Sequence, residues 1–244
     1  MNYFRLEKFS LLICMGILMM YNSSSGKSRS GKRTYSDTIT KTYLALGDSY
    51  TIGESVNRTE NFPNQLTASL RRTGLKISEP EVRARTGWTT GDLISSLQST
   101  SPQQKQYDLV TLLIGVNNQF QGRSLEEYKS EFSLLLQQAI KYAGDKKNVI
   151  VISIPDYSVT PFAASLPADE VHMISKQLNS FNKAQKEITL HTGVKFINIT
   201  PISRKGRKNP ALQAFDGLHP SAMQYTNWVK LMLPAVKNIL PSGK

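Results

Sequence analysis

Cysteine is almost absent from this sequence. The one cysteine among the 244 residues is Cys14, which lies near the N-terminus in a segment that has the pattern of a leader. A mature chain without that leader would hold no cysteine, so it could form neither disulfides nor thiolate metal sites. This composition suits an oxidising compartment.

The N-terminal apolar stretch is too short for an ordinary membrane span. It runs over residues 9–21, about a dozen apolar positions, whereas a spanning helix needs about 20. A small-residue segment follows at 23–26, where a signal peptidase could cut. We therefore predict a signal peptide over 1–26 and export to the periplasm or the medium. An uncleaved anchor is the alternative, and lipidation of Cys14 is disfavoured because bulky Ile13 precedes it.

Acidic residues are fewer than basic ones, and the formal charge is +12. Residues 1–41 hold seven Lys/Arg and two acids; subtracting these from 30 and 18 leaves 23 against 16, a net charge of +7. The basic residues are scattered and form no long run with interleaved aromatics, so we predict no nucleic-acid partner. Residues 27–41 are polar and basic and are interpreted as a flexible linker before a domain over 42–244.

The folded part alternates strands with helices. With 39% hydrophobic residues the chain can build a packed core. Continuous apolar runs predict buried strands, as in a parallel sheet covered on both faces. Ligands of such sheets bind at the carboxyl ends of the strands. Strands are expected at 43–46, 82–84, 109–114, 149–154 and 194–199, and helices at 62–72, 90–97, 124–142, 168–192 and 221–240, the last kinked or restarted at Pro234.

Small and polar residues follow the first three strands. Ser49 comes after Gly47, where exposed backbone N–H groups favour negative charge. Gly87 could present its N–H, and Asn117 carries a neutral amide donor suited to an oxyanion hole. Taken singly, each motif is also what an ordinary turn contains.

Asp216 and His219 form the clearest pair. Their spacing lets the carboxylate reach the imidazole Nδ1–H, so that Nε2 can act as a general base. The other histidines, His172 and His191, belong to a polar helix and are interpreted as surface residues. An Asp-x-x-His pair could also be half a metal site or a helix cap, but no further ligand cluster completes a metal site, and we predict no metal and no cofactor.

Together these motifs, in this order, resemble the SGNH/GDSL hydrolase family over about residues 43–240. The resemblance implies a three-layer α/β/α sandwich with a flavodoxin-like, parallel five-stranded sheet. It also implies a Ser49–His219–Asp216 triad and an oxyanion hole from the Ser49 and Gly87 N–H groups and the Asn117 side chain. Two positions depart from the family pattern, Tyr50 in place of Leu and Asn118 in place of Asp; we expect altered local hydrogen bonding rather than lost activity.

The predicted function is a serine esterase that acts through a covalent acyl-enzyme. Small-molecule or lipid acyl esters are the expected substrates, as for a lysophospholipase or a short-chain esterase, and peripheral contact with a membrane surface remains an option. The basic run 204–208 hints at an anionic substrate, although a solvated basic loop is the favoured explanation. The alternatives are a carbohydrate O-deacetylase, an acyltransferase with the same triad, and an inactive ligand-binding protein.

Overall fold

The computed structural model describes residues 40–241. The predicted signal peptide and nearly all of the predicted linker lie outside the described residues. Lys41, assigned to the linker, pairs with Ile77 in a parallel bridge, and its Nζ lies 2.8 Å from Asp108 Oδ1. Lys41 therefore belongs to the folded domain, one residue before its predicted start.

Five parallel strands form one sheet in the order β2-β1-β3-β4-β5. This confirms the predicted five-stranded flavodoxin-like arrangement. The register sets Gly47, Ala84 and Leu113 side by side at the carboxyl edge, so the segments that follow β1, β2 and β3 begin next to one another. The strands are β1 (Tyr43–Gly47), β2 (Glu81–Ala84), β3 (Leu109–Leu113), β4 (Val149–Ile152) and β5 (Lys195–Ile197).

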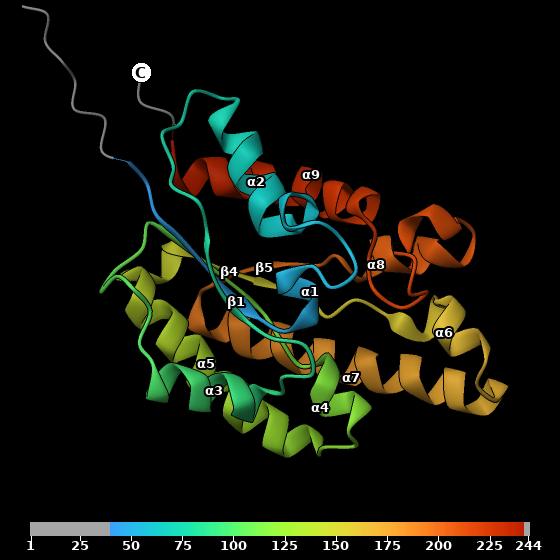
Figure 1. The fold of residues 1–244 in the computed structure, drawn as a ribbon. Helices are drawn as coiled ribbons and strands as arrows, with labels where there is room; N and C mark the ends of the chain where they lie inside the picture. The colour runs from blue at the N-terminus through green and yellow to red at the C-terminus, as the bar shows by residue number, and fades with distance from the viewer. Residues whose placement is uncertain (1–39, 242–244) are drawn as a thin grey trace, which may run out of the picture. The chain divides into compact units, whose positions relative to one another are not determined.

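Helices cover both faces of the sheet, as the prediction requires. Two of them, α2 (Phe62–Arg71) and α9 (Ala222–Ile239), lie on one face, above the sheet in Figure 1. The other face carries α3 (Thr90–Ser99), α5 (Leu125–Ala143) and α7 (Ala168–Thr192). None of the helices described is both long and apolar enough to cross a membrane.

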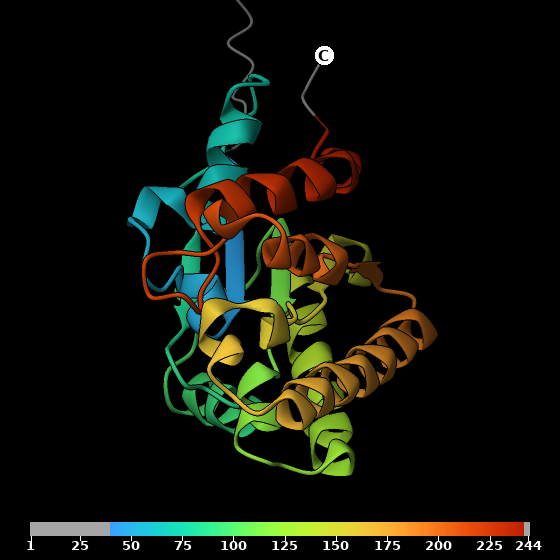
Figure 2. The same cartoon turned by 90° about the vertical axis from the view of Figure 1, so that its right-hand side faces the viewer.

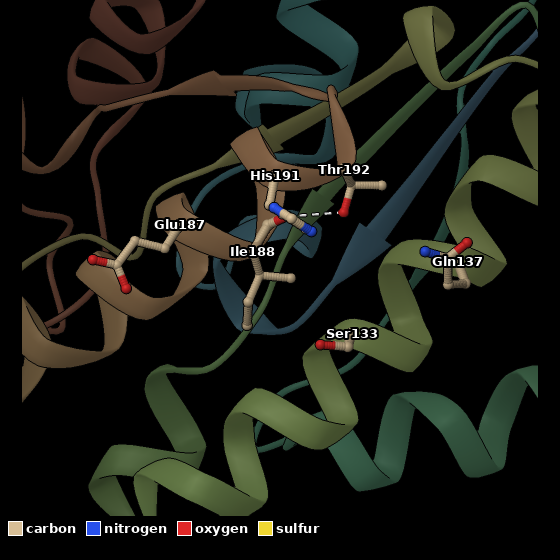
Figure 3. A pocket seen from close by; sticks show the side chains of 6 residues that line it. All are labelled: Ser133, Gln137, Glu187, Ile188, His191 and Thr192. Atoms are coloured by element: carbon tan, nitrogen blue, oxygen red, sulfur yellow. Dashed lines mark hydrogen bonds between the residues drawn. The ribbon is translucent and has the colours of Figure 1, made fainter.

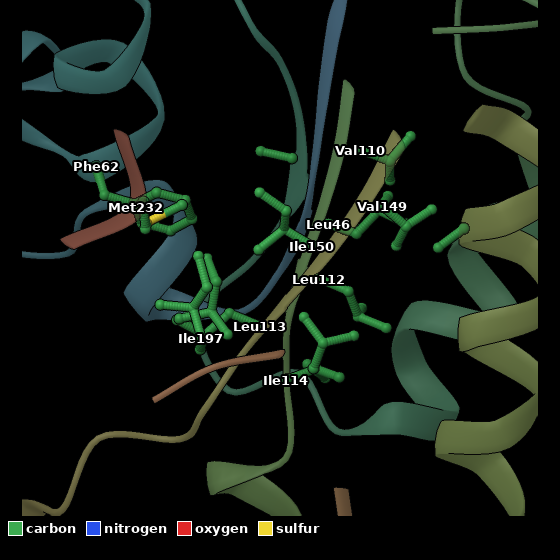
Figure 4. Packing of buried hydrophobic residues seen from close by; sticks show 14 of the residues in the cluster. Leu46, Phe62, Val110, Leu112, Leu113, Ile114, Val149, Ile150, Ile197 and Met232 are labelled. Carbon is green, nitrogen blue, oxygen red and sulfur yellow. The ribbon is translucent and has the colours of Figure 1, made fainter. Parts of the chain in front are cut away.

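The core lies between these layers. Figure 4 shows Phe62 and Met232 beside one face of the strands and Leu112 toward the other. Leu46, Leu112 and Ile150, in the three central strands, are each fully buried. Truncating such a side chain to alanine costs about 2–5 kcal/mol, so the central strands form a rigid support for the segments at their ends.

Short elements at the carboxyl edge were not predicted. They are too brief to show a periodic pattern, and their caps and packing define them instead. In Figure 1, α6 and α8 lie on the right-hand side, which Figure 2 turns toward the viewer. They are α1 (Ser49–Ile52), α4 (Val116–Phe120), η3 (Tyr157–Val159), α6 (Pro161–Ala164), α8 (Thr200–Ser203), η4 (Arg204–Arg207) and η5 (Pro210–Leu212); η1 (Arg58–Glu60) and η2 (Lys146–Asn148) are further short turns.

Pro234 does not start a new segment. Helix α9 continues through it from Ala222 to Ile239, although an interior proline costs about 3 kcal/mol. Trp228, Met232 and Val236 of α9 are buried around this position. Their burial offsets the lost backbone hydrogen bond, so tertiary packing overrides the local preference.

Candidate active site

The exit of β1 is tightly built around Gly47. A Cβ at this position would lie 2.1 Å from Thr51 Oγ1 and 2.4 Å from the Leu113 carbonyl oxygen, so only glycine fits. Asp48 then caps α1 by accepting the Tyr50 N–H at 3.0 Å. Ser49 follows as the first residue of α1, where the helix itself offers its N–H no acceptor.

Asp48 is an unusual buried carboxyl. Its side chain is fully buried, and its Oδ2 has no hydrogen-bond partner within residues 40–241. Burial raises the pKa of Asp48 to about 7, against the lowering effect of backbone hydrogen bonds. Burial thus favours the neutral form of the carboxyl beside Ser49.

The Asp216–His219 pair makes the hydrogen bond that its spacing suggests. Asp216 Oδ2 lies 2.6 Å from His219 Nδ1, and Asp216 Oδ1 accepts the backbone N–H groups of Leu218 and His219 at 2.9 and 3.0 Å. Gly217, at φ 70°, makes the turn that folds the loop back on itself. We call residues 214–220 the histidine loop.

The hydrogen bonds keep Asp216 ionised. Burial acts to raise its pKa, but the donors from Ser55, Leu218 and His219 outweigh burial and lower the pKa to about 2. A carboxylate can only accept, so His219 Nδ1 must carry the proton. That tautomer leaves Nε2 of neutral His219 as a proton acceptor.

The histidine loop lies against the start of α1. The ring of Tyr50, next to Ser49, packs edge-on to the His219 imidazole with the ring centroids 5.7 Å apart. From the other side, the Tyr225 hydroxyl of α9 donates to the Tyr50 carbonyl at 3.0 Å. Ser49 and His219 therefore share one edge of the sheet although 170 positions separate them in sequence.

Gly87 and Asn117 lie on two connected segments. The Asn117 side-chain amide donates to the Trp88 carbonyl at 2.9 Å, and the Gln121 amide donates to the Gly87 carbonyl at 3.3 Å. Because an amide nitrogen carries two hydrogens, one of them at Asn117 remains for another acceptor. Gly87 adopts φ 83°, which a side chain would disfavour.

Asn118 has a structural role beside these residues. It is fully buried, its Oδ1 accepts the Thr90 N–H at 3.0 Å, and its Nδ2 donates to Thr90 Oγ1 at 2.6 Å. The amide thus anchors the start of α3 to α4. It supplies both an acceptor and a donor, whereas a carboxylate would only accept.

An apolar groove next to these residues was not predicted. It has a volume of about 490 Å³ and lies among α4, η3, α6 and the start of α7. Phe120, three residues beyond Asn117, packs against Tyr157 and Phe162 with centroid distances of 6.1 and 6.4 Å. The Phe162 N–H donates to the Gly217 carbonyl at 2.9 Å, which ties the groove to the histidine loop.

Other hollows and histidines lie apart from this arrangement. Figure 3 shows a pocket between α5 and α7 that is lined by Ser133, Glu187 and His191, among others, and by none of the predicted site residues. His172 and His191 are both exposed on α7. Within residues 40–241, no group of three His, Cys, Asp or Glu side chains is arranged to hold a metal ion.

The fold is a three-layer α/β/α sandwich with polar side chains at the carboxyl edge of its parallel sheet. The model of the GDSL-like lipase/acylhydrolase family matches residues 45–226, and the chain belongs to this family. The resemblance inferred from the motifs is thereby confirmed, and the protein is an ester-hydrolysing enzyme. A comparison with curated proteins finds no match.

Solved structures share the fold at low sequence identity. A lipase/acylhydrolase from Enterococcus faecalis is 16% identical (TM-score 0.63, covering 81% of this chain and 96% of that one). The psychrotrophic esterase EstA from Pseudoalteromonas sp. is 17% identical (TM-score 0.60, 83% and 100%). The acetylxylan esterase Axe2 from Geobacillus stearothermophilus is 18% identical (TM-score 0.60, 83% and 95%).

Proposed function

We propose that the protein hydrolyses acyl esters with Ser49 as nucleophile, His219 as general base and Asp216 as its orienting carboxylate. The observation that carries this proposal is the 2.6 Å hydrogen bond between Asp216 and His219 Nδ1, in a loop packed against the start of α1. It leaves Nε2 as the basic nitrogen, as a serine hydrolase requires. Family membership makes ester hydrolysis the reaction in which such a pair would act.

The reaction has two halves. In the first, Ser49 Oγ bonds to the carbonyl carbon while His219 Nε2 takes the hydroxyl proton. The Ser49 and Gly87 N–H groups and the Asn117 amide are the donors for the oxyanion. The intermediate then expels the alkoxide, which takes the proton from His219 and leaves as an alcohol. In the second half, water gives a proton to His219 Nε2 as it attacks the acyl carbon. The bond from that carbon to Ser49 Oγ then breaks, and Oγ takes the proton back from His219 as the acid leaves.

The groove favours an aliphatic acyl group. Its walls include Phe120, Phe162 and Met173, whose side chains are 59%, 37% and 45% exposed. Burying a methylene group there gains about 0.8 kcal/mol, so each added carbon should strengthen binding until the groove is filled. Fatty-acyl esters such as lysophospholipids fit this better than acetylated sugars.

Part of the basic run 204–208 is available to bind an anionic group on the alcohol side of the substrate. Arg204 is already engaged, since its Nε donates to the buried Asp156 carboxylate at 2.9 Å and its Nη2 to Asn179 at 2.6 Å. Lys205, Arg207 and Lys208 are exposed next to it, on a turn that packs against η3. These three side chains are the ones available to a phosphate group or a membrane surface.

The first experiment compares hydrolysis of p-nitrophenyl acetate, butyrate and decanoate by the protein and by Ser49→Ala. We expect Ser49-dependent release that is faster with butyrate and decanoate than with acetate. The structure of EstA is described as inhibited by monoethylphosphonate; labelling by a fluorophosphonate, lost in Ser49→Ala, would report an activated Ser49 whatever the natural substrate. Absence of both activities would contradict the proposal.

The role of the basic run in binding an anionic substrate is tested with two triple variants that remove the same charge. Replacing Lys205, Arg207 and Lys208 together by alanine should slow hydrolysis of an anionic lysophospholipid more than of a zwitterionic one. The control replaces Lys141, Lys146 and Lys147, which removes the same charge near the amino edge of the sheet. Equal effects of the two triple variants would contradict a local role of the basic run.

A further inference from the structure

Ser55 is held in a conformation that its residue type disfavours. Among residues 40–241 it is the one non-glycine residue with φ in the left-handed region, at 66°. A glycine would adopt this conformation without strain, as Gly53 does two residues earlier at φ 79°. Strained residues of this kind persist where surrounding contacts fix them, and they cluster at functional sites. The Ser55 side chain is therefore the feature to explain.

The Ser55 hydroxyl contacts the predicted triad directly. It donates to Asp216 Oδ2 at 2.6 Å, although the two residues lie 161 positions apart in the sequence. The same oxygen is 2.6 Å from His219 Nδ1. The other donors to this carboxylate come from the histidine loop itself, so Ser55 is the contact that fixes the carboxylate relative to α1.

The preceding residue, Glu54, makes a second long-range contact with a segment of the site. The Glu54 carboxylate accepts the hydroxyl of Thr86, which immediately precedes Gly87. Two adjacent side chains thus reach the histidine loop and the segment that carries Gly87. The backbone that leads into Ser55 is fixed to α1, since the Gly53 and Glu54 N–H groups donate to the Ser49 carbonyl at 3.0 Å.

We propose that Glu54 and Ser55 are positioning residues that fix the histidine loop and the Gly87 segment relative to Ser49. The inference rests on the proposed function, because it assigns the two side chains to that same triad and oxyanion hole. Neither residue bonds to the substrate or exchanges a proton with it. Ser55 limits rotation of the Asp216 carboxylate, and Glu54 limits movement of the Gly87 N–H.

Two substitutions at Ser55 separate the hydroxyl from the backbone strain. Ser55→Gly removes both, whereas Ser55→Ala removes the hydroxyl and keeps the strain. A hydrogen bond to a charged group is worth a factor of roughly 10 to 100 in an equilibrium. We expect both variants to lose about tenfold in kcat with little change in KM, and Ser55→Gly to melt higher than Ser55→Ala because glycine relieves the strain. Full activity in Ser55→Gly would overturn the role of the hydroxyl.

A spectroscopic measurement distinguishes positioning from general loosening. The His219 Nδ1 proton bonded to Asp216 should give a low-field proton resonance that Asp216→Asn abolishes. In both Ser55 variants we expect this resonance to shift or broaden. Thr42→Val is the matched control, because the Thr42 hydroxyl donates to Asp108 at 3.0 Å at the amino edge of the sheet. An unchanged resonance in the Ser55 variants would overturn the proposal.

Glu54 is tested by its own pair of variants. Glu54→Gln keeps an acceptor for Thr86, and Glu54→Ala does not, so we expect Gln to retain most of the kcat that Ala loses. Fluorophosphonate labelling tests the proposed function and the positioning role separately. No labelling of the wild type would contradict the proposed function, whereas equal labelling rates in wild type, Ser55→Gly and Glu54→Ala would contradict the positioning role alone.

Discussion

Two aspartates flank the candidate site in opposite electrostatic settings. Asp48, at the exit of β1, is fully buried, and burial raises its pKa to about 7. The Asp216 side chain is 25% exposed, and its hydrogen bonds lower its pKa to about 2 against the effect of burial. The two carboxyls differ both in depth and in the hydrogen bonds that they accept: Asp48 is deeper and accepts the Tyr50 N–H, whereas Asp216 lies nearer the surface and accepts from Ser55, Leu218 and His219. Burial therefore prevails at Asp48, and the hydrogen bonds prevail at Asp216.

The largest expected effect lies at Asp216. Asp216→Asn keeps the size of the side chain but can stabilise the wrong tautomer of His219, so kcat should fall by on the order of 10,000-fold. Steady-state kinetics with a p-nitrophenyl ester would measure this loss. Asp48→Asn is the contrasting variant, because Asp48 does not contact His219; a comparable loss there would remove the distinction between the two carboxyls.

Asp48 should instead govern the pH dependence of stability. Its folded-state pKa of about 7 lies above the ordinary value of 3.8, so its favourable contribution is complete below pH 4 and disappears as the pH rises to about 7. The size is on the order of 4 kcal/mol. Urea unfolding from pH 4 to 8 should show a fall in stability that Asp48→Asn flattens. A parallel fall in the variant would assign the dependence to other groups.

Asp216 should give the opposite dependence at lower pH. Its lowered pKa means that its contribution is present above pH 4 and is lost as the pH falls toward 2. Below pH 4, the wild type should therefore lose stability faster than Asp216→Asn does. Acid unfolding followed by circular dichroism would compare the two curves, and coinciding curves would contradict the assigned hydrogen bonds.

The smallest effects concern the glycines beside the two aspartates. Gly47→Ala would place a methyl group 2.4 Å from a backbone carbonyl, which should cost about 1–3 kcal/mol or more. At Gly217 the new Cβ would lie 3.2 Å from Pro161 Cβ, and the φ of 70° adds about 1–2 kcal/mol of strain. Thermal unfolding should rank Gly47→Ala below Gly217→Ala. The reverse order would show that the β1 exit can relax.

The apolar groove and the role of Ser55 could not be predicted from the sequence. Phe120, Tyr157 and Phe162 lie on elements of five residues or fewer, which give no periodic signal. Their common groove arises from two separate connections, from β3 to α5 and from β4 to α7, that meet at one edge of the sheet. Ser55 has no sequence signal either, because its strained φ and its bond to Asp216 exist only once α1 and the histidine loop have packed together.

The sequence by itself determined the layers of this protein and the order of its motifs. Largely apolar runs such as 109–113 predict buried strands, and the three-residue spacing lets Asp216 reach His219. The tertiary structure decided what depends on distant segments: that Pro234 stays within α9, that within residues 40–241 the buried Asp48 Oδ2 has no hydrogen-bond partner, and that an apolar groove forms among α4, η3, α6 and α7. The reason is that a local pattern fixes only neighbours along the chain, whereas burial, charge and cavity shape follow from residues that meet only after folding.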